Sequence, residues 1–515
     1  MPSRRIAAFR ASRGGSGITA RTDAAVIRIG EHAAVLGGSL SGLAGAAVLA
    51  QRFERVTVVE RDSLPRTGRH RKGVPQGRHV HVLLPGGLRG LADLFPGVLE
   101  DLRGRGADVF DARALRFNIA GGSLCLEHAD LEFIAATRPL IEGIARERVR
   151  SLTNVRFVEG CDACGLTMTS DRSRVTGARL RSRTGGGEEE AVEADLVVDA
   201  TGRGSRSPRW LAAFDYPVPL EERIPVGVHY TTRLFGRAPE TSGDWRNVTV
   251  DIPPGERRGA VALAAEGDRW IVTLIGILGE RPPTDLAGFV EYARSLWTRD
   301  VHAVIADAPA IGEASTGAFP ANVWRRYDRL RRFPARYIVT GDAACSLNPV
   351  YAQGMSVAFG EALTLARVLD RHGLERVGPR FFRDTKPITR VAWTMATGAD
   401  LGHPGVQGPR TATWRLLNAY IGRVFGVAHR DPVVAEAALK VLGMVNAPQH
   451  LMHPRIASRV LTGGRDHGVP INDRVSKPAS MSARTDSAGR ATVATRHGDA
   501  PHNPASEEKW CPRQT

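Results

Sequence analysis

The sequence contains little cysteine and no long apolar run. Its 515 residues include only five cysteines, which show no disulfide framework: Cys125, Cys161, Cys164, Cys345 and Cys511. No apolar stretch approaches the roughly 20 residues that a membrane-spanning helix needs. The basic N-terminus, residues 1–30, also lacks the continuous apolar segment of a signal peptide. We therefore expect a reduced, soluble, cytoplasmic protein with no transmembrane segment.

The sequence lacks the residue patterns typical of redox dithiol sites, metal sites and Ser-His-Asp hydrolases. Cys161 and Cys164 have the spacing of a redox or zinc pair, but no thioredoxin-like context or second pair accompanies them, so we expect a structural role. His403, His450 and His453 show no metal-ligand spacing, and no nucleophile elbow of a Ser-His-Asp hydrolase occurs. We predict no metal site and assign no catalytic residue from the sequence.

Acidic residues are fewer than basic residues, and the formal net charge is +16, almost entirely from arginine. A basic balance can indicate a nucleic acid or an acidic membrane surface as partner. The arginines are scattered, however, and no clusters of aromatic and basic residues of the kind that stack on bases occur. We expect no nucleic-acid partner, and an electrostatic benefit for anionic cofactors.

Near its N-terminus the chain has a strand–turn–helix–strand pattern typical of nucleotide binding. Gly37 permits a sharp turn after an apolar strand, Ser39 takes the middle position that must be small for a phosphate to approach, and Gly42 lets the helix pack closely. Glu60 ends the second strand, where a carboxylate accepts hydrogen bonds from ribose hydroxyls, and Arg61 follows it. An ordinary glycine-rich βα turn remains the alternative.

A second pattern begins about 300 residues later. A mostly apolar strand over residues 336–340 ends in Gly341 and Asp342, at the strand end where α/β sheets place ligand-binding groups. Pro349 and Gly354 bracket a loop, and Gly354 with Met355 opens a helix whose free amides could face a flat, electron-rich ring. We expect Gly354 to need a backbone conformation closed to branched residues. The alternative is a strand–loop–helix with no ligand.

With a third motif between these two, the chain resembles the flavin monooxygenases of the para-hydroxybenzoate hydroxylase fold. The middle motif is the run at 194–205, with Asp199 and Gly202. Within that family the chain is most similar to bacterial polyether epoxidases of the lasalocid and monensin pathways, through the segments at 71–81, 232–235, 269–272 and 348–351. The resemblance covers roughly residues 33–460.

This resemblance implies FAD bound across both ends of the chain. Arg71 and Arg138 match positions that lie at the cofactor, as do Asp199 and Gly202 of the middle motif. It also implies a flavin C4a-hydroperoxide, formed with O2, that epoxidises or hydroxylates an apolar small molecule in secondary metabolism. Since no second dinucleotide-binding turn occurs, NAD(P)H must bind transiently, or a separate flavin reductase must supply the electrons.

Other functions remain open at this point. A flavin-dependent reductase of isoprenoid double bonds shares the fold, and a non-catalytic FAD-binding protein would carry the same motifs. A flavin halogenase fits less well, because no Trp-x-Trp-x-Ile-Pro segment occurs and Trp245, Trp270 and Trp297 stand alone.

The predicted fold class is α/β (α+β). We expect a Rossmann-like FAD-binding domain interleaved with an antiparallel-sheet substrate domain, followed by a C-terminal helical layer. A triple glycine at 185–187 indicates a hairpin turn, and residues 88–102 indicate a helix broken near Pro96. The predicted segments are a disordered basic tail (1–30), the FAD-binding domain (31–207), the substrate sheet (208–330), the returning FAD-binding domain (331–373), the helical region (374–463) and a disordered tail (464–515).

Overall fold

The structure is a computed structural model, and it describes residues 28–66, 68–126, 129–183, 187, 189–237 and 244–463. The predicted tails therefore lie outside the described residues, except for residues 28–30. Most of the predicted turn at 185–187 also lies outside them. The two strands on either side of that turn, β9 (Val175–Ser182) and β10 (Glu189–Glu193), do pair antiparallel.

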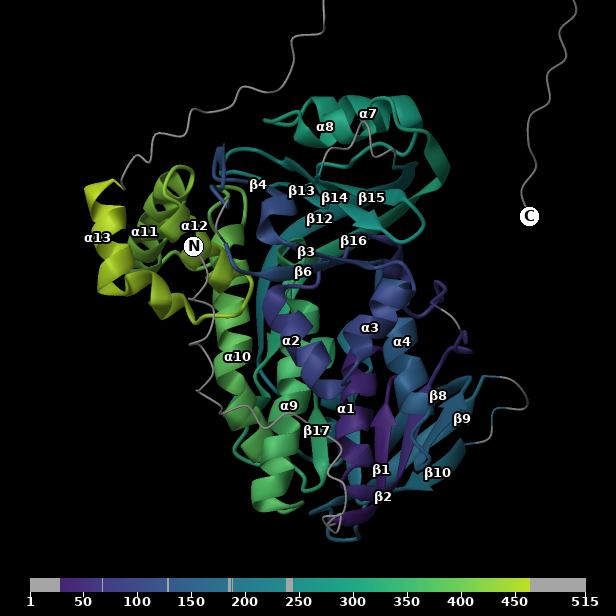
Figure 1. Ribbon diagram of the computed structural model, residues 1–515. Helices are drawn as coiled ribbons and strands as arrows, with labels where there is room; N and C mark the ends of the chain where they lie inside the picture. The colour runs from purple at the N-terminus through teal and green to yellow at the C-terminus, as the bar shows by residue number, and fades with distance from the viewer. Residues whose placement is uncertain are drawn as a thin grey trace, which may run out of the picture. The chain divides into compact units, whose positions relative to one another are not determined.

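A five-stranded sheet made only of parallel pairs forms the lower half of the described fold in Figure 1. Its order is β17-β11-β1-β2-β7. Leu36 of β1 lies beside Asp199 of β11, and Asp199 lies beside Val339 of β17, so the carboxyl ends of these strands are level. The strands are β1 (Gly30–Leu36), β2 (Phe53–Glu60), β7 (Val155–Glu159), β11 (Leu196–Asp199) and β17 (Tyr337–Val339).

Helices from distant parts of the sequence share the hydrophobic core of this sheet, some packed on its strands and others on the helices that cover it. The small-residue helix α1 follows β1 directly and is buried along almost its whole length. The predicted break near Pro96 is confirmed, since it separates α2 from α3. The helices are α1 (Leu40–Ala50), α2 (Pro85–Leu94), α3 (Val98–Gly104), α4 (Arg138–Arg150) and α9 (Gly354–His372).

A small antiparallel sheet, β8 (Cys161–Met168) with β9 and β10, also contacts the parallel sheet. Both Cys161 and Cys164 lie on β8 as free thiols.

An eight-stranded, mainly antiparallel sheet forms the upper half in Figure 1, beneath α7 (Leu286–Arg294) and α8 (Asp300–Ile305). It extends beyond the predicted range 208–330, because β4, β5 and β18 join it from outside. Its strands, in spatial order, are β18 (Cys345–Ser346), β16 (Ala310–Arg325), β12 (Glu221–Gly236), β15 (Arg269–Gly276), β14 (Arg258–Ala265), β13 (Asn247–Val250), β4 (Leu115–Ile119) and β5 (Gly122–Ser123).

A long helix, α10 (Val377–Asp400), packs against α9 and continues to a group of three further helices. These are α11 (Ala412–Ala428), α12 (Pro432–Leu442) and α13 (Pro454–Thr462), at the left of Figure 1. Across the described residues, every helix is too short or too polar to span a bilayer.

Candidate functional site

The three sequence motifs meet at the carboxyl edge of the parallel sheet. A Cβ atom placed on Gly37, after β1, would lie 2.5 Å from the carbonyl oxygen of Ala200, after β11. A Cβ atom placed on Gly341, after β17, would lie 2.7 Å from Oγ of Ser41 at the start of α1. Segments separated by about 300 residues of sequence therefore form one surface, as expected for a ligand site in an α/β sheet.

The first motif forms the tight turn that the sequence predicts. Gly37 has φ +106°, a conformation that disfavours any side chain. A Cβ on Gly42 would overlap the carbonyl oxygen of Gly37, so only glycine allows this contact. Ser39 is the N-cap of α1, but its side chain makes no capping hydrogen bond. Its hydroxyl instead donates to Oε2 of Glu142 at 2.8 Å, which leaves the first amides of α1 without a side-chain acceptor.

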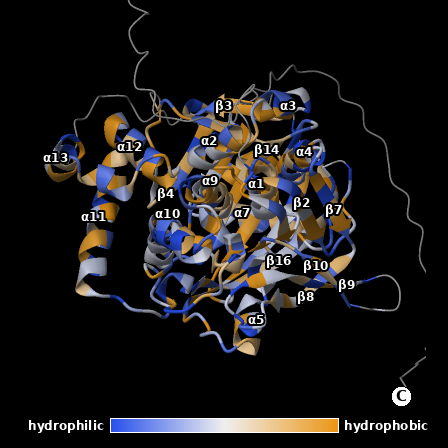
Figure 2. Ribbon diagram, turned by 90° about the horizontal axis from the view of Figure 1, so that it is seen from below, coloured by the Kyte–Doolittle hydropathy of each residue, from blue (hydrophilic) through white to orange (hydrophobic). Residues whose placement is uncertain are grey.

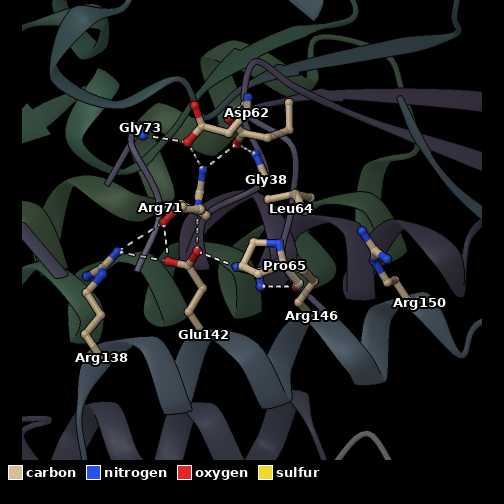
Figure 3. Close-up of polar contacts among 12 residues, drawn as sticks. Gly38, Asp62, Leu64, Pro65, Arg71, Gly73, Arg138, Glu142, Arg146 and Arg150 are labelled. Atoms are coloured by element: carbon tan, nitrogen blue, oxygen red, sulfur yellow. Dashed lines mark hydrogen bonds and ion pairs between the residues drawn. The ribbon is translucent and has the colours of Figure 1, made fainter. Parts of the chain in front are cut away.

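Beside this turn lies a cluster of three carboxylates and three guanidinium groups, which we call the arginine–carboxylate cluster (Figure 3). Arg71 is at its centre and is almost fully buried. Its Nε donates to Oε1 of Glu142 at 2.9 Å, and its Nη1 lies 3.2 Å from both Oδ2 of Asp62 and Oε2 of Glu60. The cluster consists of Glu60, Asp62, Arg71, Arg138, Glu142 and Arg146.

Glu142 joins the cluster to α1 and α4. Besides Arg71 and Ser39, it accepts a hydrogen bond from Nη2 of Arg146 at 2.7 Å and lies 3.6 Å from Nη2 of Arg138. Burial alone would raise the pKa of Glu142, but the guanidinium groups of Arg138, Arg71 and Arg146 hold it below its usual range. Glu142 is therefore ionised in the folded protein.

The cluster and the start of α1 together have hydrogen-bond donors without an acceptor. Within the described residues, Nη2 of Arg71, Nε of Arg138 and Oγ of Ser41 are buried and have no hydrogen-bond partner. Unpaired buried donors are costly, and a bound anion would satisfy them. These donors border a glycine turn that admits close approach and a helix start without a capping side chain. The arrangement fits the diphosphate of a dinucleotide such as FAD.

Glu60 is bound by amides of the chain itself, and its contact with a ribose stays a prediction. Its Oε2 accepts from the amide of Gly38 at 2.8 Å, and its Oε1 accepts from the amide of Asp62 at 3.1 Å. These bonds hold the carboxylate at the end of β2. Arg61 is exposed and lies 3.8 Å from Asp162, away from the cluster, so its contact with a cofactor stays a prediction.

In the middle motif, Asp199 shapes the backbone. Its buried carboxylate accepts from the amide and hydroxyl of Thr201 at 2.9 and 2.6 Å, from Oγ of Ser205 at 2.6 Å and from Oγ of Ser207. Gly202 follows with φ +76°. Asp199 thus fixes the turn beside Gly37 through the chain's own groups, and we expect it to act on a cofactor through that turn.

The third motif, at Gly341 and Asp342, is bound by a buried carboxylate that the sequence analysis did not identify. Oε2 of Glu361, on α9, accepts from Oγ1 of Thr340 and from the amide of Gly341, both at 2.7 Å. Burial raises the pKa of Glu361 to about 7. Asp342, at the end of β17, is half-buried, and desolvation raises the pKa of its carboxyl against the influence of Arg203 and Arg138.

The loop from residue 348 to 354 is fixed by a second buried acid. Asp400 of α10 accepts from Nδ2 of Asn348 and Oη of Tyr351, both at 2.8 Å, and from Nδ2 of Asn322 at 2.6 Å. Asn322 lies on β16, and its Oδ1 accepts from the amide of Asn348 at 2.6 Å. The loop, the antiparallel sheet and α10 are therefore tied together at one carboxylate. Pro349 follows Asn348 in this loop and is exposed.

The helix start after this loop corrects one prediction. Gly354 opens α9, as predicted, and Gln353 provides no side-chain cap, so the amides of Gly354 and Met355 have no such acceptor. The expected unusual backbone at Gly354 is wrong, however. Its φ is not in the left-handed region, and a Cβ there would meet only Oδ1 of Asp342, at 3.9 Å. The left-handed residue is Ala352, with φ +56°.

On the side of the antiparallel sheet, an apolar cluster lies next to the loop. Tyr230 and Phe319 are buried in it, and Val350 of the loop packs against it. The hydroxyl of Tyr230 is buried without a partner in the described part of the chain. The ring of His79 lies 5.5 Å from the Tyr230 ring, and burial, followed by the charge of Arg78, lowers the pKa of His79 to about 4.

Sequence reasoning missed several of these residues because their role depends on contacts between distant segments. Glu361, Asp400 and Tyr230 carry no local motif. A signal for Glu142 did exist. Arg138, Glu142 and Arg146 recur every four residues on α4, so one carboxylate lies between two arginines in a single row along the helix.

Solved structures identify the class of fold. The crystal structure of p-nitrophenol 4-monooxygenase PnpA from Pseudomonas putida is 17% identical, with a TM-score of 0.57, and the match covers 81% of this chain and 98% of that chain. The flavin-dependent brominase Bmp2 is 14% identical, with a TM-score of 0.57 and coverage of 80% and 93%. The chain therefore has the α/β fold shared by FAD-dependent monooxygenases and flavin-dependent halogenases, of the para-hydroxybenzoate hydroxylase type.

One curated protein is similar enough in sequence to show the family of this chain. Protein Rv3254 of Mycobacterium tuberculosis is 33% identical over 429 residues, which cover 81% of this chain and 90% of the relative. The chain belongs to the same protein family as Protein Rv3254. No protein-family model matches the chain.

Proposed function

We propose that the protein is an FAD-dependent monooxygenase that epoxidises or hydroxylates an apolar small molecule. One observation carries this proposal: buried, unpartnered donors of Arg71, Arg138 and Ser41 surround the uncapped start of α1 at the carboxyl edge of the parallel sheet. An extended dinucleotide with a diphosphate matches these donors in charge and in hydrogen-bonding capacity. The fold shared with flavin-dependent monooxygenases supports FAD as that dinucleotide.

In this proposal the chain's own residues hold and orient the cofactor. Arg71 and Arg138 bind the diphosphate, and Glu60 accepts the ribose hydroxyls. The amides of Gly354 and Met355 face the flavin, where the start of α9 favours negative charge on the reduced ring. When bound, FAD supplies the reaction of its reduced ring with O2 that provides the transferred oxygen atom.

The eight-stranded sheet provides the proposed substrate side. Tyr230 and Phe319, with Val350 from the loop of residues 348–354, form an apolar wall, which supports an apolar substrate. The hydroxyl of Tyr230 is available to orient a polar group there. The likeness of segments such as 71–81 and 348–351 to polyether epoxidases favours epoxidation and a place in secondary metabolism. NAD(P)H is the proposed source of electrons, used directly or through a separate flavin reductase, in the cytoplasm.

The test uses the full chain loaded with FAD, supplied with NAD(P)H and O2 labelled with ¹⁸O. Reactions run with and without an added flavin reductase, on a panel of apolar alkenes and aromatic compounds. Mass spectrometry should show one ¹⁸O atom in a product, with the second oxygen atom released as water. A product that has gained two hydrogens and no oxygen would indicate a double-bond reductase. FAD that binds but is never reduced would indicate a non-catalytic FAD-binding protein.

A further inference from the structure

Four large hydrophobic side chains are exposed on the helices that follow α10. The exposed fractions are 76% for Leu416, 45% for Leu417, 58% for Met452 and 63% for Leu461. Exposed apolar residues that gather in one place mark an interaction surface, whereas isolated ones carry no meaning. Figure 2 shows α11 at the edge of the view, with hydrophobic and hydrophilic residues side by side along its length.

These four residues lie on neighbouring elements, and we call the surface that carries them the arm surface. Oη of Tyr420, on α11, donates to the carbonyl oxygen of Leu451 at 2.7 Å, which places Met452 beside the middle of α11. Arg423, one turn later, donates to the carbonyl oxygen of Leu461 at 2.9 Å. Leu416 and Leu417 lie on the turn before Tyr420. The arm surface therefore consists of Leu416, Leu417, Met452 and Leu461.

The arm surface is surrounded by positive charge. Residues 410–463 contain seven arginines and lysines but only two carboxylates. Both carboxylates are already paired, Asp431 with Arg459 at 2.7 Å and Glu436 with Lys440 at 2.6 Å. The excess positive charge is exposed, and it includes Arg415, Arg423, Arg430 and Arg455.

We propose that the arm surface docks the protein on an anionic lipid bilayer. Leucine and methionine side chains that enter the boundary between headgroups and acyl chains, next to arginines that contact anionic headgroups, are the combination that interfacial helices use. An apolar substrate dissolved in the bilayer would then be close to the protein. The docking itself does not depend on the proposed reaction.

Charge argues against two other occupants of this surface. A second copy of the chain would bring an equally positive surface against the first, and the two would repel. Residues 464–515 contain eight arginines and lysines against six carboxylates, so that segment is not complementary to the arm surface either.

The experiment measures co-sedimentation of the full chain with vesicles of phosphatidylcholine alone, or of equal parts of phosphatidylcholine and phosphatidylglycerol. We expect binding to the anionic vesicles only, weakened by salt. The variant L416Q/L417Q should lower the partition coefficient about tenfold or more, because two side chains no longer enter the bilayer. The variant R415Q/R455Q should also bind less and depend less on salt.

The matched control is L220Q/L286Q, since Leu220 is 62% and Leu286 44% exposed outside the arm surface. This control should bind vesicles like the parent, and FAD content should be the same in all variants. Absence of binding by the parent chain overturns the proposal, as does equal binding of the arm variant and the control. Light scattering that shows a dimer, dissolved by L416Q/L417Q, would instead assign the surface to a second copy.

Discussion

At the scale of single residues, Arg71 has the most consequences for the proposed cofactor site. Its side chain is buried among three carboxylates and still has one unpartnered nitrogen. We predict that Arg71→Gln weakens FAD binding by about 1–3 kcal/mol, the range of a charge-assisted hydrogen bond. The measurement is equilibrium titration of the apoprotein with FAD.

The matched control is Arg69→Gln, in the same loop but exposed. It should leave FAD affinity unchanged, because an exposed charge contributes little at this range. If the two variants bind FAD equally tightly, Arg71 does not contact the cofactor.

Glu361 provides a prediction on pH. Burial raises its pKa from about 4.5 in the unfolded chain to about 7 in the folded protein, so the folded state binds the proton more tightly. The free energy of unfolding should therefore fall as pH rises from about 4.5 to about 7, and this contribution should be constant above that range. Glu361→Gln should remove the dependence, since the amide oxygen can still accept from the amide of Gly341.

Denaturant unfolding of both proteins at about pH 5 and about pH 8 tests this. The variant should gain about 3 kcal/mol relative to the parent between the two conditions, from the size of the shift. If the difference in the free energy of unfolding between the variant and the parent is the same at both pH values, Glu361 does not titrate in this range.

At the scale of elements, α1 offers a matched pair of glycines. A Cβ on Gly42 would overlap the carbonyl oxygen of Gly37, whereas a Cβ on Gly45 meets nothing within 4 Å. We predict that Gly42→Ala destabilises the fold by about 2–4 kcal/mol, because the helix must move away from the turn. Gly45→Ala should stabilise it by about 0.5–1 kcal/mol through helix propensity. Thermal unfolding distinguishes the two, and equal effects would mean that α1 does not pack as described.

The elements themselves were predictable to different degrees. Strands with clear apolar runs were found, as at β1, β2 and β17, and the turns after β1 and β17 were recognised from their glycine motifs. β16 was missed because it is rich in small and polar residues. α10 lies in the predicted helical region 374–463, but its extent as one helix was not predicted; it contains Pro387, and its buried face, including Phe381 and Ala392, outweighs that local penalty.

The site was predictable only where its residues are local in sequence. Gly37, Gly42 and Glu60 belong to a single βαβ unit, so their spacing was informative. Glu142 reaches Ser39 across about a hundred residues, and Asp400 reaches Asn348 from a different helix. Such contacts depend on how helices pack against the sheets, which spacing along the chain does not encode.

At the scale of the whole molecule, Asp400 connects three parts of the fold. It is buried on α10 and accepts hydrogen bonds from β16, through Asn322, and from the loop of residues 348–354, through Asn348 and Tyr351. Asp400→Asn places an amide donor among these donors. We predict a loss of about 2–4 kcal/mol in the free energy of unfolding, because buried donors lose their acceptor.

An exposed aspartate gives the control. Asp307→Asn, on the surface after α8, should change stability by less than about 0.5 kcal/mol in the same urea unfolding experiment. If Asp400→Asn is as mild as Asp307→Asn, the antiparallel sheet and the loop are not held together by this carboxylate.

The central claim is that one FAD binds across the carboxyl edge of the parallel sheet. The most direct measurement is the absorbance spectrum of the full chain titrated with FAD, followed by separation of free from bound flavin. The account predicts one FAD per chain with a perturbed flavin spectrum, and weaker binding in Arg71→Gln than in Arg69→Gln. FAD that keeps its free spectrum and separates completely from the protein would contradict it.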